Sequence, residues 1–335
     1  MPPTLLFGAG GIGEGNISHT WTNVDETSSL LDDLEELGLT QLDSAASYPP
    51  GAPWTTERLL GETKAAKRGF LIDTKVLATE ETVDGSLSEA KIDESVKKSL
   101  ELLGVKQVNI LFAHAPDPKT PAEETAKAFD RYFRAGTIKQ LGLSNYNTEQ
   151  MKDYLEVCEA KGYQKPTIYQ GHYNAICRQH EFTLFPLLRA HGIKIFAFGP
   201  LAGGFLTGKV SIPSPGTDLT GGRWTPGGLP AYPKTFDKPV LHDAMKIFMD
   251  KCKEKGLSST EVSLRWIMHH SELGEGDGII LGATKVTQLK GNVEFCRKGR
   301  LDEGLVEACE ELWGRVRGEM EATKLIYEEQ VQMSG

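Results

Sequence analysis

Four side chains that could move a proton together stand in the first third of the chain. Asp43, Tyr48, Lys75 and His114 supply a carboxylate, a phenol, an ammonium and an imidazole. Each stands at, or shortly after, the end of a short apolar run typical of a strand. The carboxyl ends of parallel strands share one rim, where ligands bind. We therefore expect these four groups to lie together in a site for proton transfer.

The elements that must position these groups alternate along nearly the whole chain, short apolar runs with longer amphipathic ones. The predicted strands cover residues 5–7, 41–43, 70–75, 108–113, 138–143, 167–169, 194–198 and 278–281. The predicted helices cover residues 26–37, 57–67, 88–103, 121–134, with Pro121 in the first turn, 149–160 and 181–190. Eight strand–helix units are the number at which a parallel sheet closes. The sequence therefore predicts an α/β fold, a (β/α)8 TIM barrel.

The chain has 335 residues, which exceeds the roughly 250 residues of a typical barrel. Two segments account for the excess: a long Gly/Pro-rich loop after the seventh strand, residues 203–239, and an extra C-terminal helix, residues 302–319. No internal repeat or low-complexity linker interrupts the sequence. We expect residues 1–335 to form a single domain.

The composition argues against several classes of protein. A net charge of -9 does not suit a nucleic-acid surface, which needs a basic stripe. No apolar run approaches the roughly 20 residues of a membrane span, and residues 1–7 do not have the features of a secretory signal. The five cysteines form no Cys-x-x-Cys pair and are odd in number, as expected of free thiols in a reducing compartment. We expect a cytoplasmic protein without nucleic-acid or membrane partners, and leave open whether it is a monomer or a homo-oligomer.

The glycine-rich segment Gly8-Ala9-Gly10-Gly11-Ile12-Gly13 matches the spacing of a dinucleotide-binding Rossmann loop. In that motif the third glycine opens a helix directly, so that helix N–H groups meet the phosphate. Here the polar turn Glu14-Gly15-Asn16 follows instead. We therefore predict a glycine-rich connection at the rim of a barrel.

Several motifs around the four groups resemble those of the aldo-keto reductase family. Leu42-Asp43-Ser44-Ala45 with Tyr48 resembles the family's Asp-Thr-Ala…Tyr signature, Thr74-Lys75-Val76 carries its lysine, and Leu111-Phe112-Ala113-His114 its histidine. Residues 138–145 resemble its fifth strand, and Tyr169-Gln170 its sixth. The segment Pro200-Leu201-Ala202-Gly203-Gly204-Phe205-Leu206-Thr207-Gly208-Lys209 resembles the loop after strand seven in the aflatoxin-aldehyde reductase branch. The resemblance extends from Gly8 to about Asn292.

The resemblance implies an oxidoreductase that reduces an aldehyde or ketone to the alcohol with NADPH. Tyr48 would be the general acid, because hydride transfer leaves an alkoxide that needs a proton. A phenol with the ordinary pKa of about 10 donates slowly at neutral pH, so the Lys75 cation would favour release, and Asp43 would keep Lys75 charged. His114 would bind the carbonyl oxygen. No metal is required, because Tyr48 and His114 form the oxyanion site.

The resemblance also implies a cofactor site assembled from strands five to eight. The residues that would bind the cofactor are Asp43, Ser144, Asn145, Gln170, Pro200, Leu201, Gly203, Gly204, Lys209, Arg223, Gly282, Thr284, Lys285, Gln288 and Asn292. Many relatives have two cations where this chain has Thr284-Lys285; one cation and one hydroxyl can hold a 2′-phosphate, with Arg223 as a second cation. This favours NADPH over NADH. The aromatic partner of the nicotinamide stays open, near Phe198-Gly199-Pro200.

The substrate side departs from the family, because residues 49–56 are proline-rich where relatives commonly have a shorter Gly/Ser segment. Trp21, Trp54 and Trp224 could join Tyr48 and His114 around a pocket for a bulky or aromatic carbonyl. The three tryptophans could equally be loop anchors.

Two other functions stay open. One is a cofactor-binding regulatory subunit of the channel-β type, which has this fold and little turnover. The other is a barrel isomerase or aldolase in which Lys75 forms a Schiff base. Each of the four groups, taken alone, could also be structural, as a helix cap, a packed ring or a satisfied polar side chain.

Overall fold

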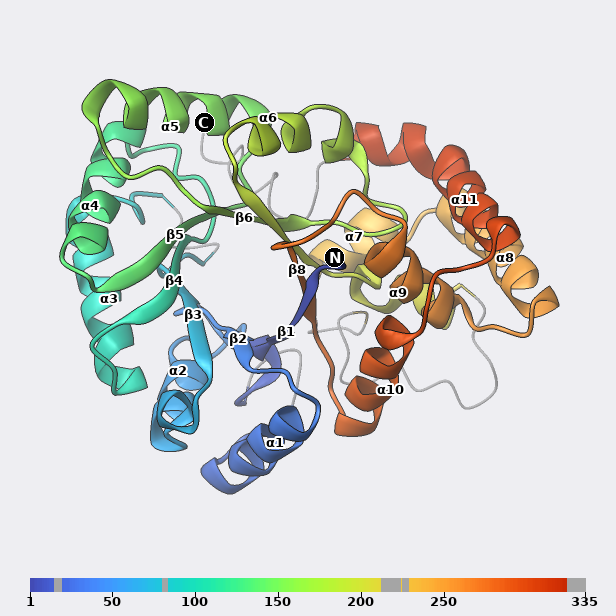
Figure 1. Cartoon of the computed structure of the whole chain (residues 1–335), viewed down its shortest axis with the longest axis horizontal. Helices are drawn as coiled ribbons and strands as arrows, with labels where there is room; N and C mark the ends of the chain where they lie inside the picture. Colours follow the sequence, from blue (N-terminus) through green and yellow to red (C-terminus); the bar gives the residue numbers. More distant parts are fainter. Residues whose placement is uncertain (15–19, 80–83, 212–223, 225–228, 324–335) are drawn as a thin grey trace.

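The eight predicted strands close into one parallel barrel in the computed structural model (Figure 1). The structure describes residues 1–14, 20–79, 84–211, 224 and 229–323. The strands are β1 (Thr4–Gly8), β2 (Gln41–Asp43), β3 (Leu71–Lys75), β4 (Val108–Ala113), β5 (Ile138–Ser144), β6 (Ile168–His172), β7 (Lys194–Phe198) and β8 (Gly278–Leu281). Each pairs in parallel with its neighbours in chain order, and β1 pairs with β8. The predicted (β/α)8 barrel is confirmed.

Helices surround the strands, and α8 lies beside α11 at the outside of the ring (Figure 1). The helices are α1 (Val24–Glu36), α2 (Thr55–Glu62), α3 (Glu89–Leu103), α4 (Ala122–Arg134), α5 (Thr148–Lys161), α6 (Leu184–Ala190), α7 (Ala231–Phe236), α8 (Pro239–Glu254), α9 (Ser259–His269), α10 (Val286–Arg297) and α11 (Glu303–Ala322). Short 3-10 helices are η1 (Ala9–Gly11), η2 (Ala65–Arg68), η3 (Gln179–Phe182) and η4 (Ala202–Thr207).

At four helix starts, side chains accept otherwise unpaired backbone N–H groups. Asn23, Ser258 and Asp302 cap α1, α9 and α11 in this way. At α5, Asn147 and Gln150 form a complete capping box. These caps fix the first turns of α1, α5, α9 and α11.

The inside of the barrel is packed rather than hollow. Its apolar layer consists of Leu6, Ile110, Phe112, Ile168, Phe196 and Ile280. Small residues make room for the large ones: a Cβ at Gly142 would lie 2.2 Å from the Phe112 ring. A larger apolar layer lies between the strands and the helices. Because the interior is filled, ligands can bind only at the rim.

Two predicted helices prove to be divided. The helix predicted at 57–67 is α2 followed by η2, since Lys64 has a φ of +54° that no α-helix accommodates. The helix predicted at 181–190 is η3 followed by α6. Pro121, predicted in the first turn of its helix, is the residue just before α4, with extended backbone.

The long segment after β7 is more structured than predicted. It contains η4 and α7, and it leads into α8 and α9, which our strand–helix pattern did not mark. The helical spacing was present, because Leu241, Met245, Phe248 and Cys252 are the buried positions of α8. The extra C-terminal helix is confirmed as α11.

Candidate active site

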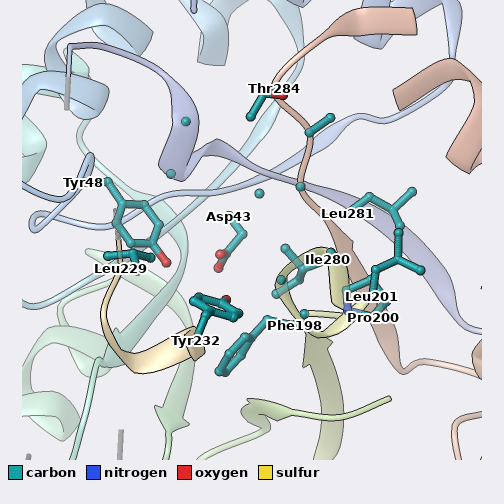
Figure 2. Close-up of a pocket in the computed structure, with 18 of the residues that line it drawn as sticks. Asp43, Tyr48, Phe198, Pro200, Leu201, Leu229, Tyr232, Ile280, Leu281 and Thr284 are labelled. Atoms are coloured by element: carbon teal, nitrogen blue, oxygen red, sulfur yellow. The ribbon is translucent and has the colours of Figure 1, made fainter. Parts of the chain in front are cut away.

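The four predicted groups meet at the carboxyl rim of the barrel. Asp43 ends β2, Lys75 ends β3, His114 directly follows β4, and Tyr48 lies in the loop between β2 and α2. Asp43, Tyr48 and His114 line one pocket. In Figure 2 the Tyr48 hydroxyl and the Asp43 carboxylate point into the same space. The four groups therefore lie together at one rim, as the positions of the strand ends predicted.

A buried ion pair lies under the phenol. Lys75 is fully buried, with its Nζ 2.8 Å from Asp43 Oδ1 and donating to the Ser44 carbonyl at 2.8 Å. Gln170 Nε2 donates to the same carboxylate at 2.8 Å. The ammonium lies 4.8 Å from the centre of the Tyr48 ring. Hydrogen bonds of this kind are what allow a charged pair to persist away from water.

His114 also contacts the phenol. Its ring meets the Tyr48 ring edge-on, with 5.7 Å between the centroids. Its Nδ1 lies 3.1 Å from Ser47 Oγ. Burial, and then the Lys75 charge, lower the pKa of His114 well below its ordinary value. The imidazole is therefore neutral at neutral pH, with one N–H and one lone pair.

Polar groups at the ends of β5 and β6 form the next part of the wall. Ser144, Asn145 and Gln170 all line the pocket. Asn145 Nδ2 donates to the His114 carbonyl at 2.9 Å and to Ser144 Oγ at 3.0 Å. The side-chain carbonyl is then the group that Asn145 can offer to a ligand.

Backbone without side chains forms much of the remaining wall. Glycines at the end of β1 and after β1, β7 and β8 line the pocket: Gly8, Gly10, Gly11, Gly199, Gly203, Gly204 and Gly282. Residues 12–14, directly after the N-terminal glycines, are not helical, and α1 begins at Val24, so in the described part of the chain the predicted loop at the barrel rim is confirmed in place of a Rossmann loop. These glycines nevertheless lie in the same pocket as Tyr48, which our sequence analysis did not anticipate.

The pocket suits an extended ligand. Its empty space of about 1300 Å³ includes open solvent at the mouth, and its lining residues extend from the ends of β1 and β8 to Tyr48 and to the loop after β7. Gly203 and Gly204 have φ values of +64° and +100°, so the chain passes close to the pocket without a Cβ between backbone and ligand. Amide side chains at one side and bare backbone at the other fit a nicotinamide dinucleotide.

Most of the predicted cofactor residues line this pocket. They are Asp43, Ser144, Asn145, Gln170, Pro200, Leu201, Gly203, Gly204, Gly282, Thr284, Gln288 and Asn292. Lys209, just beyond η4, and Lys285, just before α10, are exposed and are not among the lining residues. Arg223 lies outside the described residues.

The three tryptophans predicted for the substrate pocket are not among its lining residues. Trp21 is buried and meets Phe7 edge-on, with ring centroids 6.0 Å apart. Trp54 precedes α2, with Lys98 Nζ 4.3 Å from its ring centre. Trp224 Nε1 donates to the Gly203 carbonyl at 2.9 Å. Their contacts match the alternative of loop anchors.

The structure adds lining residues that the sequence analysis missed, among them Leu229 and Tyr232. Phe198, near which the aromatic partner of the nicotinamide was left open, also lines the pocket; it ends β7, and its ring stacks on His172 with the centroids 5.0 Å apart. Tyr232 comes from α7, inside the Gly/Pro-rich segment, where no periodic pattern pointed to it. Figure 2 shows the rings of Phe198 and Tyr232 in the wall near Asp43.

Within the described ranges, no three His, Cys, Asp or Glu side chains are grouped so that they could hold a metal ion. No helix there is long and apolar enough to cross a membrane. All five cysteines are buried and unpaired with one another.

Comparison with known proteins agrees with this geometry. The model of the Aldo/keto reductase family matches residues 4–314. Human aflatoxin B1 aldehyde reductase member 2 is 34% identical over 297 residues, covering 85% of this chain and 80% of that protein. Oxidoreductase sirO of Leptosphaeria maculans is 34% identical over 332 residues, covering 96% and 97%. Both the family and the branch indicated by the motifs are confirmed. The chain belongs to the aldo-keto reductase family of oxidoreductases.

Proposed function

We propose that this protein reduces an aldehyde or a ketone to the alcohol with NADPH, and that Tyr48 is the general acid. The observation that carries the proposal is the buried Asp43–Lys75 pair beneath the Tyr48 ring, beside a neutral imidazole in one pocket. Family membership supports carbonyl reduction and a nicotinamide cofactor.

Each of the four groups then has a defined task. The bound nicotinamide supplies the hydride. Tyr48 gives the carbonyl oxygen its proton, so hydride and proton together complete the alcohol. The Lys75 ammonium stabilises the phenolate left behind, and Asp43 holds that ammonium in place. His114 donates a hydrogen bond to the same oxygen, which gives the developing negative charge two donors.

The preference for NADPH is supported by the segment after β8. Thr284 lines the pocket just before α10, and Lys285 is the residue from which that helix begins. A helix N-terminus favours a phosphate, because its unpaired N–H groups and dipole point toward the anion. We expect kcat/KM with NADPH to exceed kcat/KM with NADH. A Lys285→Met variant should lower the ratio of these two values.

The substrate wall favours an apolar or aromatic carbonyl. Phe198, Leu229 and Tyr232 supply apolar surface near Tyr48. No Lys or Arg is among the residues that line the described pocket, so a carboxylate tail on the substrate would find no counter-charge there. The relatives named aldehyde reductases favour an aldehyde.

The contacts of Lys75 disfavour the Schiff-base enzyme, and an activity assay separates the reductase from the regulatory subunit. A Schiff-base lysine needs an uncharged, nucleophilic amine, whereas Lys75 is paired with Asp43 and donates to the Ser44 carbonyl. A regulatory subunit of the channel-β type would have the same fold and bind NADPH without appreciable turnover.

One assay tests the proposal. Purified protein with NADPH and 4-nitrobenzaldehyde should lose the absorbance of the reduced nicotinamide. Tyr48→Phe should lower kcat by about 10²–10⁴-fold, the usual contribution of a general acid, with the Kd for NADPH nearly unchanged. Tyr132→Phe is the matched control, because its hydroxyl bonds Asp93 on the helical layer, away from the pocket. Full activity of Tyr48→Phe would contradict the assignment, and NADPH binding without turnover in the unmodified protein would favour the regulatory subunit.

A further inference from the structure

Ser47, the residue just before Tyr48, contacts the imidazole of the site. Its Oγ lies 3.1 Å from His114 Nδ1. Ser47 is 9% exposed, and Nδ1 is the only hydrogen-bond partner of its hydroxyl among the residues that the structure describes. No catalytic task described above uses this hydroxyl.

The loop that carries Ser47 is held tightly to the barrel. The Ala46 N–H donates to the Lys75 carbonyl at 3.1 Å, and the Trp54 N–H donates to the Ala46 carbonyl at 2.7 Å. The Tyr48 N–H donates to the Ala45 carbonyl at 3.1 Å. One short loop thus places the phenol in the pocket and the serine hydroxyl against His114.

The proton of a neutral imidazole can sit on either ring nitrogen, and the two forms do different chemistry. With the proton on Nδ1, Nε2 would turn a lone pair toward the carbonyl oxygen, which repels it. With the proton on Nε2, His114 can donate to that oxygen. Burial and the Lys75 charge keep His114 neutral, so it carries only one ring proton. The position of that proton then decides whether His114 can donate to the carbonyl oxygen.

The Ser47 hydroxyl favours the second form. If it accepted a hydrogen bond from Nδ1–H, its own proton would have no acceptor among the described residues. A buried donor without a partner is unfavourable. If the Ser47 hydroxyl donates to Nδ1, its proton has an acceptor, and the imidazole proton must then be on Nε2.

We propose that Ser47 is a positioning residue that donates to His114 Nδ1 and so holds His114 as the Nε2–H tautomer, the form that donates to a carbonyl oxygen. The proposal rests on the proposed reduction, because it assigns the proton that His114 offers in that reaction. Ser47 acts through His114 and does not touch the substrate.

The tautomer can be measured without any turnover. In protein labelled with 15N-histidine, long-range 1H–15N correlation spectra at pH 7 distinguish a protonated from an unprotonated ring nitrogen. The His114 signals are identified by their loss in His114→Gln. We expect Nε2–H in the unmodified protein, a shift toward Nδ1–H in Ser47→Ala, and Nε2–H again in Ser47→Thr, which keeps the hydroxyl. Ser263→Ala, a buried serine of α9 outside the pocket, should leave the tautomer unchanged.

Kinetics supply the second readout. Ser47→Ala should lower kcat/KM for the carbonyl about fivefold, the effect of about one hydrogen bond, while the Kd for NADPH stays the same; Ser47→Thr should recover most of the loss. An Nδ1–H tautomer in the unmodified protein, an unchanged tautomer in Ser47→Ala, or a changed tautomer with unchanged kcat/KM would each overturn the proposal. Full activity of Tyr48→Phe would instead overturn the proposed function. The tautomer of His114 would still be known in that case, because its measurement needs no turnover.

Discussion

At the scale of single residues, the Asp43–Lys75 pair is the most sensitive contact of the site. The Lys75 side chain is 0% exposed and that of Asp43 4%. Removing one partner of a buried pair leaves an uncompensated charge and costs about 3–5 kcal/mol. We expect Lys75→Met to lower the free energy of unfolding by about that amount, measured by urea denaturation, and to abolish turnover.

A double variant separates the lost pair from other effects of the substitution. Adding Asp43→Asn to Lys75→Met removes the stranded charge and should restore part of the stability, since the two positions are in contact. Lys152→Met is the surface control, because Lys152 and Glu149 pair on the exposed side of α5. It should leave the free energy of unfolding without a measurable change. Additive losses in the double variant would argue against a charge-compensated pair.

At the scale of elements, η4 and α7 are fitted to each other through one glycine. Gly203 has a φ of +64°, and a Cβ there would lie 2.1 Å from the Tyr232 ring. Its neighbour Gly204 also has a positive φ, of +100°, but a Cβ would meet nothing within 4 Å. Replacing either glycine by alanine therefore strains the backbone, but only at Gly203 does the added Cβ collide with a neighbour. This difference makes the two variants a matched pair.

Gly203→Ala should displace Tyr232 from the pocket wall and also strain the backbone by about 1–2 kcal/mol, whereas Gly204→Ala should add the strain without moving Tyr232. We expect Gly203→Ala to raise KM for an aromatic aldehyde by about tenfold or more relative to Gly204→Ala, because small displacements near a reacting group are costly. Steady-state kinetics on both variants decide the matter. Equal KM values would show that the Tyr232 contact does not shape the pocket.

At the scale of the whole molecule, a buried carboxyl links three elements behind the site. Glu57 of α2 is fully buried and accepts from Thr74 of β3 at 2.6 Å and from Ser99 of α3 at 3.1 Å. Burial raises its pKa from 4.5 to about 7, against the opposing effects of these hydrogen bonds and of Lys75. The Thr74 and Lys75 positions are adjacent on β3, so this carboxyl supports the strand that carries the Lys75 ammonium.

The raised pKa gives stability a defined dependence on pH. The folded chain holds the Glu57 proton more tightly than the unfolded chain, so this contribution is present below about pH 4.5 and is lost as pH rises through about 7. We expect Glu57→Gln, which keeps one acceptor, to flatten the fall in the free energy of unfolding between pH 5 and 7. Denaturant titrations at several pH values measure it.

Glu62→Gln tests whether that change belongs to the buried group. Glu62 lies on the same helix but is half-exposed and paired with Arg58. Its variant should keep the slope of the unmodified protein. An unchanged slope in Glu57→Gln would show that the Glu57 carboxyl is already charged throughout this range. Asp73, whose pKa burial also raises to about 7, keeps part of the slope in every variant.

By itself the sequence determined the barrel and the rim at which the four candidate proton-transfer groups lie. Strand periodicity and spacing suffice for this, because in a closed parallel barrel every strand end faces the same side. Asp43, Lys75 and His114 were therefore placed by counting strands, and Tyr48 by its motif. The predicted cofactor residues at the ends of β5 to β8 came instead from the resemblance to the family, and most of them line the pocket.

The tertiary structure alone decided which loop side chains reach that rim. Ser47 meets His114 and Tyr232 meets Gly203 across connections that carry no periodic pattern. The tryptophans that looked suited to the pocket became anchors, because Trp21 packs against Phe7 and Trp224 donates to the Gly203 carbonyl of η4. Strand ends are located by repeating geometry, whereas the direction of a loop side chain depends on contacts between segments far apart in the chain, which only the folded molecule brings together.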